Sequence, residues 1–551
     1  MYVFIVRQQT LLLVPVLIFL ALGGLLTLAA WLAGPTPPPV VGLAAASAHL
    51  VEKLFPEGGL GKVVLGPADL LAEMLLAGEL DYLVELEPPP SNLVRWRLGY
   101  LVPAVVVPFF DSRWELASDE LTALLRAAPG QILVAQELAL PGFPWWEQPV
   151  QYLSSGEVVE QLREGRAALG IIPLQERKPA VRVLPLDGID PRRCGTEPLA
   201  YPLTRPLYLS RKPRNILGRL RDWVQIRLGY PAGALPLSPR SSYADPWAGE
   251  ITLVAAGDIM LDRDVKRAAL QQGWEYPFAE TAPVLRQADL SFANLESPIG
   301  DRGRFINMFQ APPQAVEGLA FAGLDVLSLA NNHALDYHHE GLLETMRLLR
   351  EYGLDWVGAG RDIYEARSPL LREIRGVTVG FLAYTEMWFV HAREPISWRA
   401  TREEPGVAPA ELELVVEDVQ RLKAIADVVV VSLHWGREYV HEPTPEQRNL
   451  AHAAAAAGAD LVLGHHPHVL QGLEFYENSV LAYSLGNFVF DLDLPSTWET
   501  MLLEFTLSKE GVRDLTIIPA YSSGVQPRVL DGAHREAVYQ RIKHYSLQLQ
   551  N

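Results

Sequence analysis

The sequence predicts an α/β protein, because hydrophobic strand-like runs alternate with helical segments along most of its 551 residues. Residues 101–110 and 167–174 are typical of buried strands, and residues 118–128 have the periodicity of an amphipathic helix. A chain of this length predicts more than one domain, since one domain usually holds about 100–200 residues. Its content of 49% hydrophobic and 20% charged residues is enough for packed cores.

The N-terminal region contains an uncharged segment long enough to cross a membrane. Residues 11–34 are almost entirely apolar, and no charged residue lies between Arg7 and Glu52. A helix of this length spans a hydrocarbon core of about 30 Å. Arg7 predicts an N-terminus inside the cell and the bulk of the chain outside it. We therefore expect residues 1–34 to be a single-pass anchor in the cell membrane, with a cleaved signal peptide or a buried core helix as the alternatives.

The remaining sequence divides into two predicted folded regions. Residues 35–49 are rich in proline at their start and predict a stiff spacer, and residues 50–215 alternate strand-like and helical runs. Residues 216–249 are expected to be a linker, because their second half is rich in Pro, Gly, Ser and Ala without periodicity. The second domain is expected over residues 250–500, and residues 501–551 are expected to supply the strands and tail that close it.

Charge and cysteine content narrow the classes of function. The 47 Lys and Arg residues against 65 Asp and Glu residues give a net charge of −18, which disfavours nucleic acid as a partner. Cys194 is the single cysteine, so the chain has no intrachain disulfide and no cysteine-rich zinc site. Of the 13 histidines, only His49 precedes the linker. Any metal site must therefore use His, Asp, Glu or Asn, and it is expected in the second domain.

Five hydrophobic strands of the second domain end in polar residues. They lead into Asp258, into Asn294 and Glu296, into Asn331, Asn332 and His333, into His434, and into His465, His466 and His468. Open α/β sheets hold their sites at the carboxyl ends of the strands. Taken singly, His434 has an alternative interpretation as a structural histidine, and Asp258 as a helix cap. Together, so many buried polar groups need the compensation that a divalent cation supplies.

Six motifs within residues 250–495 carry a family resemblance. They are GDIML, NLESP, ANNHALD, LHWGREY, GHHPHVLQG and YSLGNFVFD. In this order they resemble the CapA family of capsule (poly-γ-glutamate) synthesis, a branch of the calcineurin-like metallophosphoesterase superfamily. The resemblance implies a four-layer α/β/β/α sandwich with one or two divalent metal ions at the strand ends, and Mn, Fe and Zn all suit the expected ligands.

The resemblance also implies a role for the individual residues. The implied metal ligands are Asp258, Glu296, Asn332, His434, His466 and His468. His333 is the implied catalytic residue, which contacts a phosphate oxygen and protonates the leaving group after attack by an activated water. Asn487 and Asp491 are expected to support the site from outside. Met260 stands where an ordinary phosphoesterase has a histidine, which predicts a single metal or one weaker metal site.

The first domain carries a second resemblance. Its runs at 76–86, 101–110, 165–174 and 181–209 resemble type II periplasmic solute-binding proteins, nearest to the phosphate-binding kind. That fold binds ligands at helix N-termini and strand ends, where free backbone N–H groups suit an anion. The Gly/Ser-rich phosphate loops of those proteins are missing from this sequence, so a scaffold or sensory role without a ligand is the alternative.

These expectations combine into one functional hypothesis. The chain is expected to act outside the cytoplasm in the synthesis, export or anchoring of an anionic surface polymer such as poly-γ-glutamate. Expected partners are the membrane, the polymer or a phosphoester substrate, and capsule-synthesis membrane proteins, but not nucleic acid. Two alternatives remain: a metal-dependent hydrolase of phosphoesters or of the polymer, and a polymer-binding or sensing module without catalysis.

Overall fold

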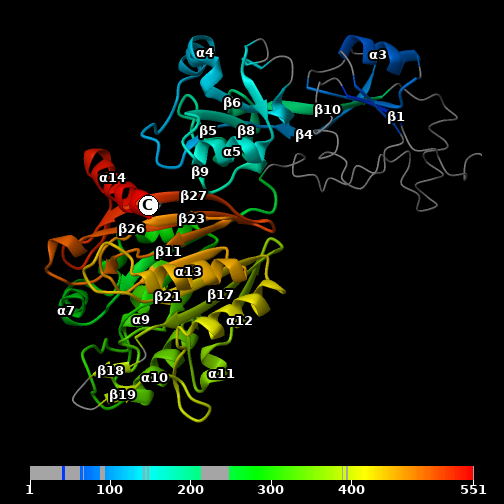
Figure 1. Ribbon diagram of the computed structural model, residues 1–551. Helices are drawn as coiled ribbons and strands as arrows, with labels where there is room; N and C mark the ends of the chain where they lie inside the picture. The colour runs from blue at the N-terminus through cyan, green and yellow to red at the C-terminus, as the bar shows by residue number, and fades with distance from the viewer. Residues whose placement is uncertain are drawn as a thin grey trace, which may run out of the picture. The chain divides into compact units, whose positions relative to one another are not determined.

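The chain folds into two compact units (Figure 1). The computed structural model describes residues 40–43, 62–65, 68–77, 79–86, 93–139, 143–145, 148–195, 197–211, 247–387, 389–391 and 395–549. Among these residues, the second unit comprises those from 249 onward together with 108–112 and 177–182, and the first comprises the other described residues. The expected membrane segment at 11–34 lies outside the described residues. Within the described ranges, no helix combines the length and the apolar composition that a membrane crossing requires.

Two five-stranded sheets, with strand orders β2-β1-β3-β10-β4 and β7-β6-β8-β5-β9, are built mainly from residues of the first unit. Their strands are β1 Val40–Leu43, β2 Lys62–Leu65, β3 Tyr82–Glu85, β4 Val94–Leu101, β5 Pro103–Pro108, β6 Ile132–Ala135, β7 Gln151–Leu153, β8 Leu169–Pro173, β9 Val181–Val183 and β10 Arg205–Arg211. The helices are α3 Ala68–Ala77, α4 Ser118–Ala127 and α5 Ser155–Arg163. The predicted strands within 101–110 and 167–174 and the predicted helix at 118–128 are thereby confirmed.

Two boundaries of this unit differ from those expected. Residues 40–43 belong to the expected spacer 35–49, yet they form β1, which pairs in parallel with β2 and β3. The reason is that VVGL is itself a short β-favouring run. At the other end, Trp247 belongs to the expected linker, but its Nε1 donates to Pro191 O at 2.9 Å. This partly buried contact accompanies the assignment of residues 247–248 to the first unit.

The second unit is built on two large mixed sheets. The first has the order β14-β13-β12-β11-β26-β27-β28, with β25 also paired to β11, and the second has the order β16-β17-β21-β22-β24-β23. The first sheet contains β11 Ile251–Ile259, β12 Leu290–Leu295, β13 Val326–Ser328, β14 Asp355–Val357, β25 Asn487–Val489, β26 Glu499–Ser508, β27 Gly511–Tyr521 and β28 Arg528–Val529. The second contains β16 Leu370–Ile374, β17 Val377–Thr385, β21 Val428–His434, β22 Leu461–His465, β23 Leu473–Tyr476 and β24 Ser479–Ala482. Two small pairs, β15 Ala359–Gly360 with β20 Gly406–Val407 and β18 Phe389–His391 with β19 Pro395–Ser397, lie outside these sheets.

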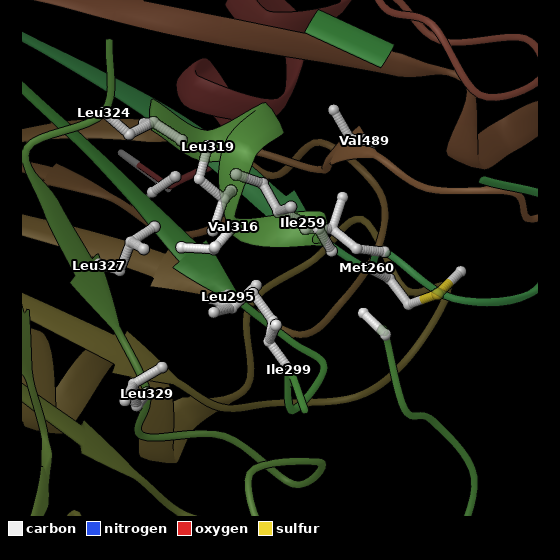
Figure 2. Packing of buried hydrophobic residues seen from close by; sticks show 14 of the residues in the cluster. Ile259, Met260, Leu295, Ile299, Val316, Leu319, Leu324, Leu327, Leu329 and Val489 are labelled. Atoms are coloured by element: carbon white, nitrogen blue, oxygen red, sulfur yellow. The ribbon is translucent and has the colours of Figure 1, made fainter. Parts of the chain in front are cut away.

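Helices pack against each large sheet. Those of this unit are α7 Arg263–Gln272, α8 Ala282–Gln287, α9 Ala315–Ala322, α10 His338–Glu351, α11 Ile363–Ala366, α12 Leu412–Lys423, α13 Pro445–Ala457 and α14 Gly532–Gln548. Helices α7 to α10 share a core with β11, β12 and β13, which Figure 2 shows around Leu295, Leu319 and Leu327. Helices α12 and α13 share a second core with β17, β21 and β22. Each sheet therefore has a helix layer on one face.

The opposite faces of the two sheets pack against each other. Phe292 of β12 and Phe381 of β17 stack with ring centroids 5.9 Å apart and planes 6° apart. Both rings are fully buried, as are the flanking residues of the same strands. Strands covered on both faces are nearly continuous hydrophobic runs, which is why VVVVSL of β21 shows no polar alternation. The mixed α/β fold predicted from the sequence is confirmed.

The parallel strands fix where the polar residues meet. β11, β12 and β13 run parallel in the first sheet, and β17, β21 and β22 run parallel in the second. Asp258 pairs in register with Asn294, and His434 pairs in register with His465. The carboxyl ends of β11 and β22 bring the two sheets together there, because Asp258 contacts His465. The polar strand ends thus share one edge of the unit.

Replacing Phe292 by alanine tests the contact between the sheets. We expect Phe292→Ala to lower the free energy of unfolding by about 3–5 kcal/mol, because it leaves a cavity opposite Phe381. Chemical denaturation of the purified protein measures this change. Leu270→Ala is the control, since Leu270 is 68% exposed on α7 and its truncation should change stability little. Equal effects of the two substitutions would contradict this packing.

Candidate metal centre

Asp258 lies at the carboxyl end of β11 and is completely buried. Its Oδ1 accepts a hydrogen bond from Asn294 Nδ2 at 2.9 Å and lies 3.1 Å from His465 Nδ1. Burial raises the pKa of Asp258, but the hydrogen bond and charge of His465 outweigh it, and the pKa falls below its ordinary value. Asp258 is therefore held as a carboxylate inside the protein.

A glycine allows Asp258 to take this position. The Asp258 N–H donates to Gly486 O at 3.1 Å, which brings the segment before β25 against β11. A Cβ atom on Gly257 would lie 1.9 Å from that same Gly486 oxygen. The strand register also shifts between Ala255 and Asp258. Only a residue without a side chain fits at position 257.

Glu296 follows β12 directly and is also completely buried. Neither of its carboxylate oxygens has a hydrogen-bond partner among the described residues. Its Oε1 lies 3.7 Å from His434 Nε2 and 3.7 Å from His468 Nε2. Burial, followed by the charges of Asp258 and Glu438, raises the pKa of Glu296 well above its ordinary value. A buried carboxyl group with a raised pKa needs a positive charge beside it to lose its proton.

Three imidazoles surround Glu296. His434 ends β21, and His466 and His468 lie in the turn after β22 with φ of 94° and 59°. His466 Nδ1 lies 3.1 Å from His434 Nε2. Burial and the neighbouring histidines lower the pKa of His434 well below its ordinary value and that of His466 to about 3, and burial also lowers the pKa of His468. Neutral imidazoles present lone pairs, which are what a metal ion binds.

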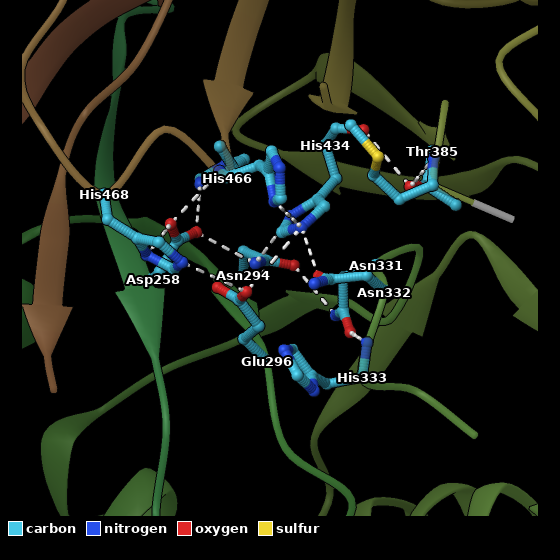
Figure 3. A network of polar contacts seen from close by, with 12 residues as sticks. Asp258, Asn294, Glu296, Asn331, Asn332, His333, Thr385, His434, His466 and His468 are labelled. Carbon is cyan, nitrogen blue, oxygen red and sulfur yellow. Dashed lines mark hydrogen bonds and ion pairs between the residues drawn. The ribbon is translucent and has the colours of Figure 1, made fainter. Parts of the chain in front are cut away.

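Two groups of three side chains have the geometry to hold a metal ion. One is Glu296, His466 and His468, and the other is Asp258, Glu296 and His434. Within each group, one ligand atom of every residue lies within 4.8 Å of the others. Glu296 belongs to both groups, and Figure 3 shows its carboxylate on the side that faces Asp258, His434, His466 and His468. Its two unpaired oxygens and the surrounding neutral imidazoles therefore fit one or two divalent cations.

Asn332 and His333 approach the same centre from the loop after β13. Asn332 Oδ1 lies 2.7 Å from His434 Nε2. His333 Nδ1 lies 2.8 Å from Asp336 Oδ2, and its ring packs on Phe309 with centroids 4.3 Å apart. Figure 3 shows His333 beside Glu296. The structure thus brings together all seven predicted site residues, whose roles as ligands and catalyst stay predictions.

Several residues that organise the centre had no predicted role. Asn331 Nδ2 donates to Asn294 Oδ1 at 3.1 Å and to Leu295 O at 2.8 Å, and its Oδ1 accepts from His333 N at 3.1 Å. Asp336 orients His333 from the next turn of the same loop. The sequence feature that could have indicated this role of Asp336 is its position three residues after His333 in the ANNHALD motif. Asn331 was expected only as part of the polar cluster that follows a strand, and the local sequence did not indicate its contacts with the neighbouring strand β12.

Asn487 and Asp491, which were expected to support the site, make different contacts. Asn487 Oδ1 lies 2.8 Å from His468 Nδ1, which leaves His468 Nε2 facing Glu296. Asp491 lies further along the chain than Asn487, and its carboxylate forms an ion pair with Arg263. Met260 is fully buried in the hydrophobic core next to Ile259 and Val489, as Figure 2 shows. It therefore offers the centre no nitrogen or oxygen ligand.

Comparisons with known proteins agree with the motifs. Residues 252–492 match the family described as "Bacterial capsule synthesis protein PGA_cap". The capsule biosynthesis protein CapA of Bacillus anthracis is 33% identical over 305 residues, which cover 53% of this chain and 73% of that protein. This chain belongs to the CapA family. The PGA biosynthesis protein CapA of Bacillus subtilis is likewise 33% identical over 305 residues, covering 52% of this chain and 79% of that protein.

Solved structures add little to this assignment. An ABC-type phosphate transport receptor from Vibrio cholerae matches with 13% sequence identity and a TM-score of 0.28, over 34% of this chain and 91% of that chain. These values are too low to carry an argument. The solute-binding resemblance of residues 50–215 therefore stays a prediction.

Gly257→Ala tests the close approach of backbone that positions Asp258 in this CapA-family centre. We expect a loss of about 3 kcal/mol of stability, because the new Cβ forces the Gly486 carbonyl away from β11. Thermal and chemical unfolding of the purified protein measure it. Gly156→Ala in α5 is the matched control, since its Cβ would meet nothing within 4 Å. A Gly257→Ala protein as stable as the control would show that the two segments do not approach in this way.

Proposed function

We propose that this CapA-family protein acts in the synthesis, export or anchoring of an anionic surface polymer such as poly-γ-glutamate, through a metal-dependent, phosphoesterase-like centre. The observation that carries the proposal is the shared Glu296, whose two unpaired oxygens lie between two sets of candidate ligands. We further propose that the two facing sheets with their helix layers form the metallophosphoesterase sandwich. The names of the Bacillus relatives support the polymer as the substrate class.

The proposed centre is dinuclear or mononuclear, with Glu296 as the residue shared by both positions. Asp258 and His434 complete one position, and His466 and His468 complete the other. Asn332 adds a neutral amide oxygen close to His434. A set of imidazole, carboxylate and amide ligands suits Mn, Fe or Zn. When bound, such a cation lowers the pKa of water and offsets negative charge that develops on an ester or amide centre.

The protein's own residues supply orientation and a proton. Asp336 holds Nδ1 of His333, so the other ring nitrogen is left to donate a proton to a departing oxygen. Asn487 fixes the ring of His468 in the same way. The buried walls formed by β11, β12 and β21 keep bulk water from the ligand side chains. This arrangement favours hydrolysis or transfer at a phosphoryl or acyl group.

We also propose that residues 11–34 anchor the chain in the cell membrane, with both folded units outside the cytoplasm. The proposal is supported by the length of the uncharged run and by Arg7 before it. Capsule-synthesis proteins of the same membrane are then the expected partners. Fractionation of cells that produce the full chain, followed by protease treatment of intact cells, tests this placement.

Elemental analysis of the purified chain tests the metal centre. We expect close to stoichiometric transition metal in the unaltered protein and loss of at least about tenfold in affinity for Glu296→Ala and His466→Ala, since each removes a ligand. His452→Ala is the control, because His452 contacts Glu474 on the surface of the unit, away from Glu296. Folded protein that takes up no Mn, Fe or Zn would contradict the proposal.

Turnover assays separate catalysis from binding. We expect His333→Ala to lower kcat for a phosphoester or γ-glutamyl substrate by about 10²–10⁴-fold, because the proton donor is lost. Asp336→Asn should lower kcat less, by about 10–100-fold, with a changed pH profile, because His333 remains but is misoriented. Both variants should keep their metal. Metal-dependent polymer binding with no product in any assay would instead favour the non-catalytic module.

A further inference from the structure

The loop at residues 300–311 is fixed beside the candidate metal centre by carboxylates from outside it. Glu344 of α10 accepts from the backbone N–H groups of Asp301 at 2.8 Å and Arg302 at 2.7 Å. Asp262 accepts from Gln310 N at 2.9 Å. The loop has no regular secondary structure within it, yet both of its ends are held. Its side chains are therefore presented from a rigid backbone.

Asp336 ties the middle of this loop to His333. The oxygen of Asp336 that contacts His333 Nδ1 also accepts from Met308 N at 3.1 Å and Phe309 N at 2.7 Å. The Asp336 backbone oxygen accepts from Ile306 N at 2.8 Å. The ring of Phe309 packs on the ring of His333. The position of the loop and the orientation of the proposed proton donor are thus set by one side chain.

Arg263 lies over the aromatic residues that line the centre. Its guanidinium carbon is 4.9 Å from the ring centre of Phe309 and 5.9 Å from that of Phe490. Phe309 contacts His333, and Phe490 contacts His468 with centroids 5.0 Å apart. Arg263 adopts a φ of 48°, an uncommon backbone conformation for a residue with a side chain. It is held at the border of the centre in a strained conformation.

Arg263 retains hydrogen-bonding capacity in this position. Its Nε and Nη2 groups pair with Asp491. A guanidinium carries five N–H donors, so donors remain for a second anion. Its side chain is 37% exposed, against 6% for Asp491. The pair therefore presents the arginine, and not the carboxylate, to the solvent.

Two further arginines, both of the loop at residues 300–311, are exposed. Arg302 has a side chain that is 69% exposed and lies 3.5 Å from Glu344. Arg304 is exposed and has no ion-pair partner within the described ranges. We call Arg263, Arg302 and Arg304 the arginine rim. Beside it, Phe305 and Met308 are 61% and 52% exposed.

We propose that the arginine rim binds successive carboxylates of an anionic polymer and thereby positions one of its units at the metal centre. This inference rests on the proposed function and names the residues that select its substrate. The chain carries a charge of −18, and Asp301 of the same loop is also exposed. Arg304 nevertheless has no ion-pair partner among the described residues, and Arg263 keeps N–H donors beyond those that bind Asp491. The exposed Phe305 and Met308 suit the methylene groups between the carboxylates of a γ-linked glutamate chain. A single small phosphate would use one arginine and neither apolar residue.

Binding of an end-labelled poly-γ-glutamate chain to the purified protein, measured by fluorescence anisotropy, tests the rim. We expect affinity to fall as salt is raised, and to fall about tenfold for Arg263→Gln and for Arg304→Gln, because each loses a charge-assisted contact. Arg304→Gln removes no ion pair among the described residues, so loss of such a pair does not explain its effect. Arg421→Gln is the matched control, since Arg421 is 69% exposed on α12 and its ion-pair partners in the described part of the chain, Glu417 and Asp418, belong to the same helix. Its affinity should stay within about twofold of the unaltered protein.

The same titration has outcomes that overturn the inference. Equal affinity for Arg263→Gln, Arg304→Gln and Arg421→Gln, equal affinity for the amidated, uncharged chain, or no binding by the unaltered protein would each contradict it. Metal content, measured on the same samples, separates this failure from failure of the proposed function. If every protein retains metal but the arginine substitutions do not change polymer affinity, the proposal for the arginine rim is rejected. The proposed metal centre is then not contradicted. If the unaltered protein contains no metal, the result counts against the proposed function. The polymer affinities of the arginine variants still test whether the arginine rim binds the polymer.

Discussion

The burial of the Glu296 carboxylate without a hydrogen bond is the constraint on which the rest of the second unit depends. An isolated buried carboxylate is expensive, and most proteins pair it or protonate it. Here, burial and neighbouring acids raise its pKa, while the surrounding histidines are held neutral. Those histidines cannot supply the missing charge. The proposed divalent cation would resolve this conflict, because a cation provides positive charge and accepts lone pairs from both residue types.

The fold places these groups together by the way its strands end. Parallel strands of two sheets carry Asp258 and Glu296 on one side and His434 and His465 on the other. The segment at residues 483–486 lies close against β22 and against β11. These contacts need glycine at position 464, where a Cβ would lie 1.9 Å from Tyr483 O, and at position 257, where a Cβ would lie 1.9 Å from Gly486 O. The hydrophobic contact between the sheets is thus what forces polar strand ends into one small volume. The stability of the second unit's core and the geometry of the candidate metal centre therefore both depend on the packing of the two sheets.

Much of this arrangement could be predicted from the sequence, because buried strands are visible as hydrophobic runs and their ends as polar clusters. Asp258, Glu296 and His434 were predictable for that reason. The double role of Asp336, in contrast, depends on N–H groups of residues 306–309, far from it in the chain. Strand β1 was assigned to a spacer because prolines precede it, and its pairing with β2 and β3 is a tertiary effect. Local patterns identify elements and their ends, but not which distant backbone a side chain will bind.

The most direct test of the central claim is the position of bound metal in crystals of the purified protein, measured by anomalous diffraction at a transition-metal absorption edge. The account predicts one or two peaks beside the Glu296 carboxylate, each at about 2.0–2.2 Å from its oxygen or nitrogen ligands. Peaks located elsewhere in the unit would contradict the account. So would the absence of a peak in metal-soaked crystals in which Glu296 is hydrogen-bonded to another side chain.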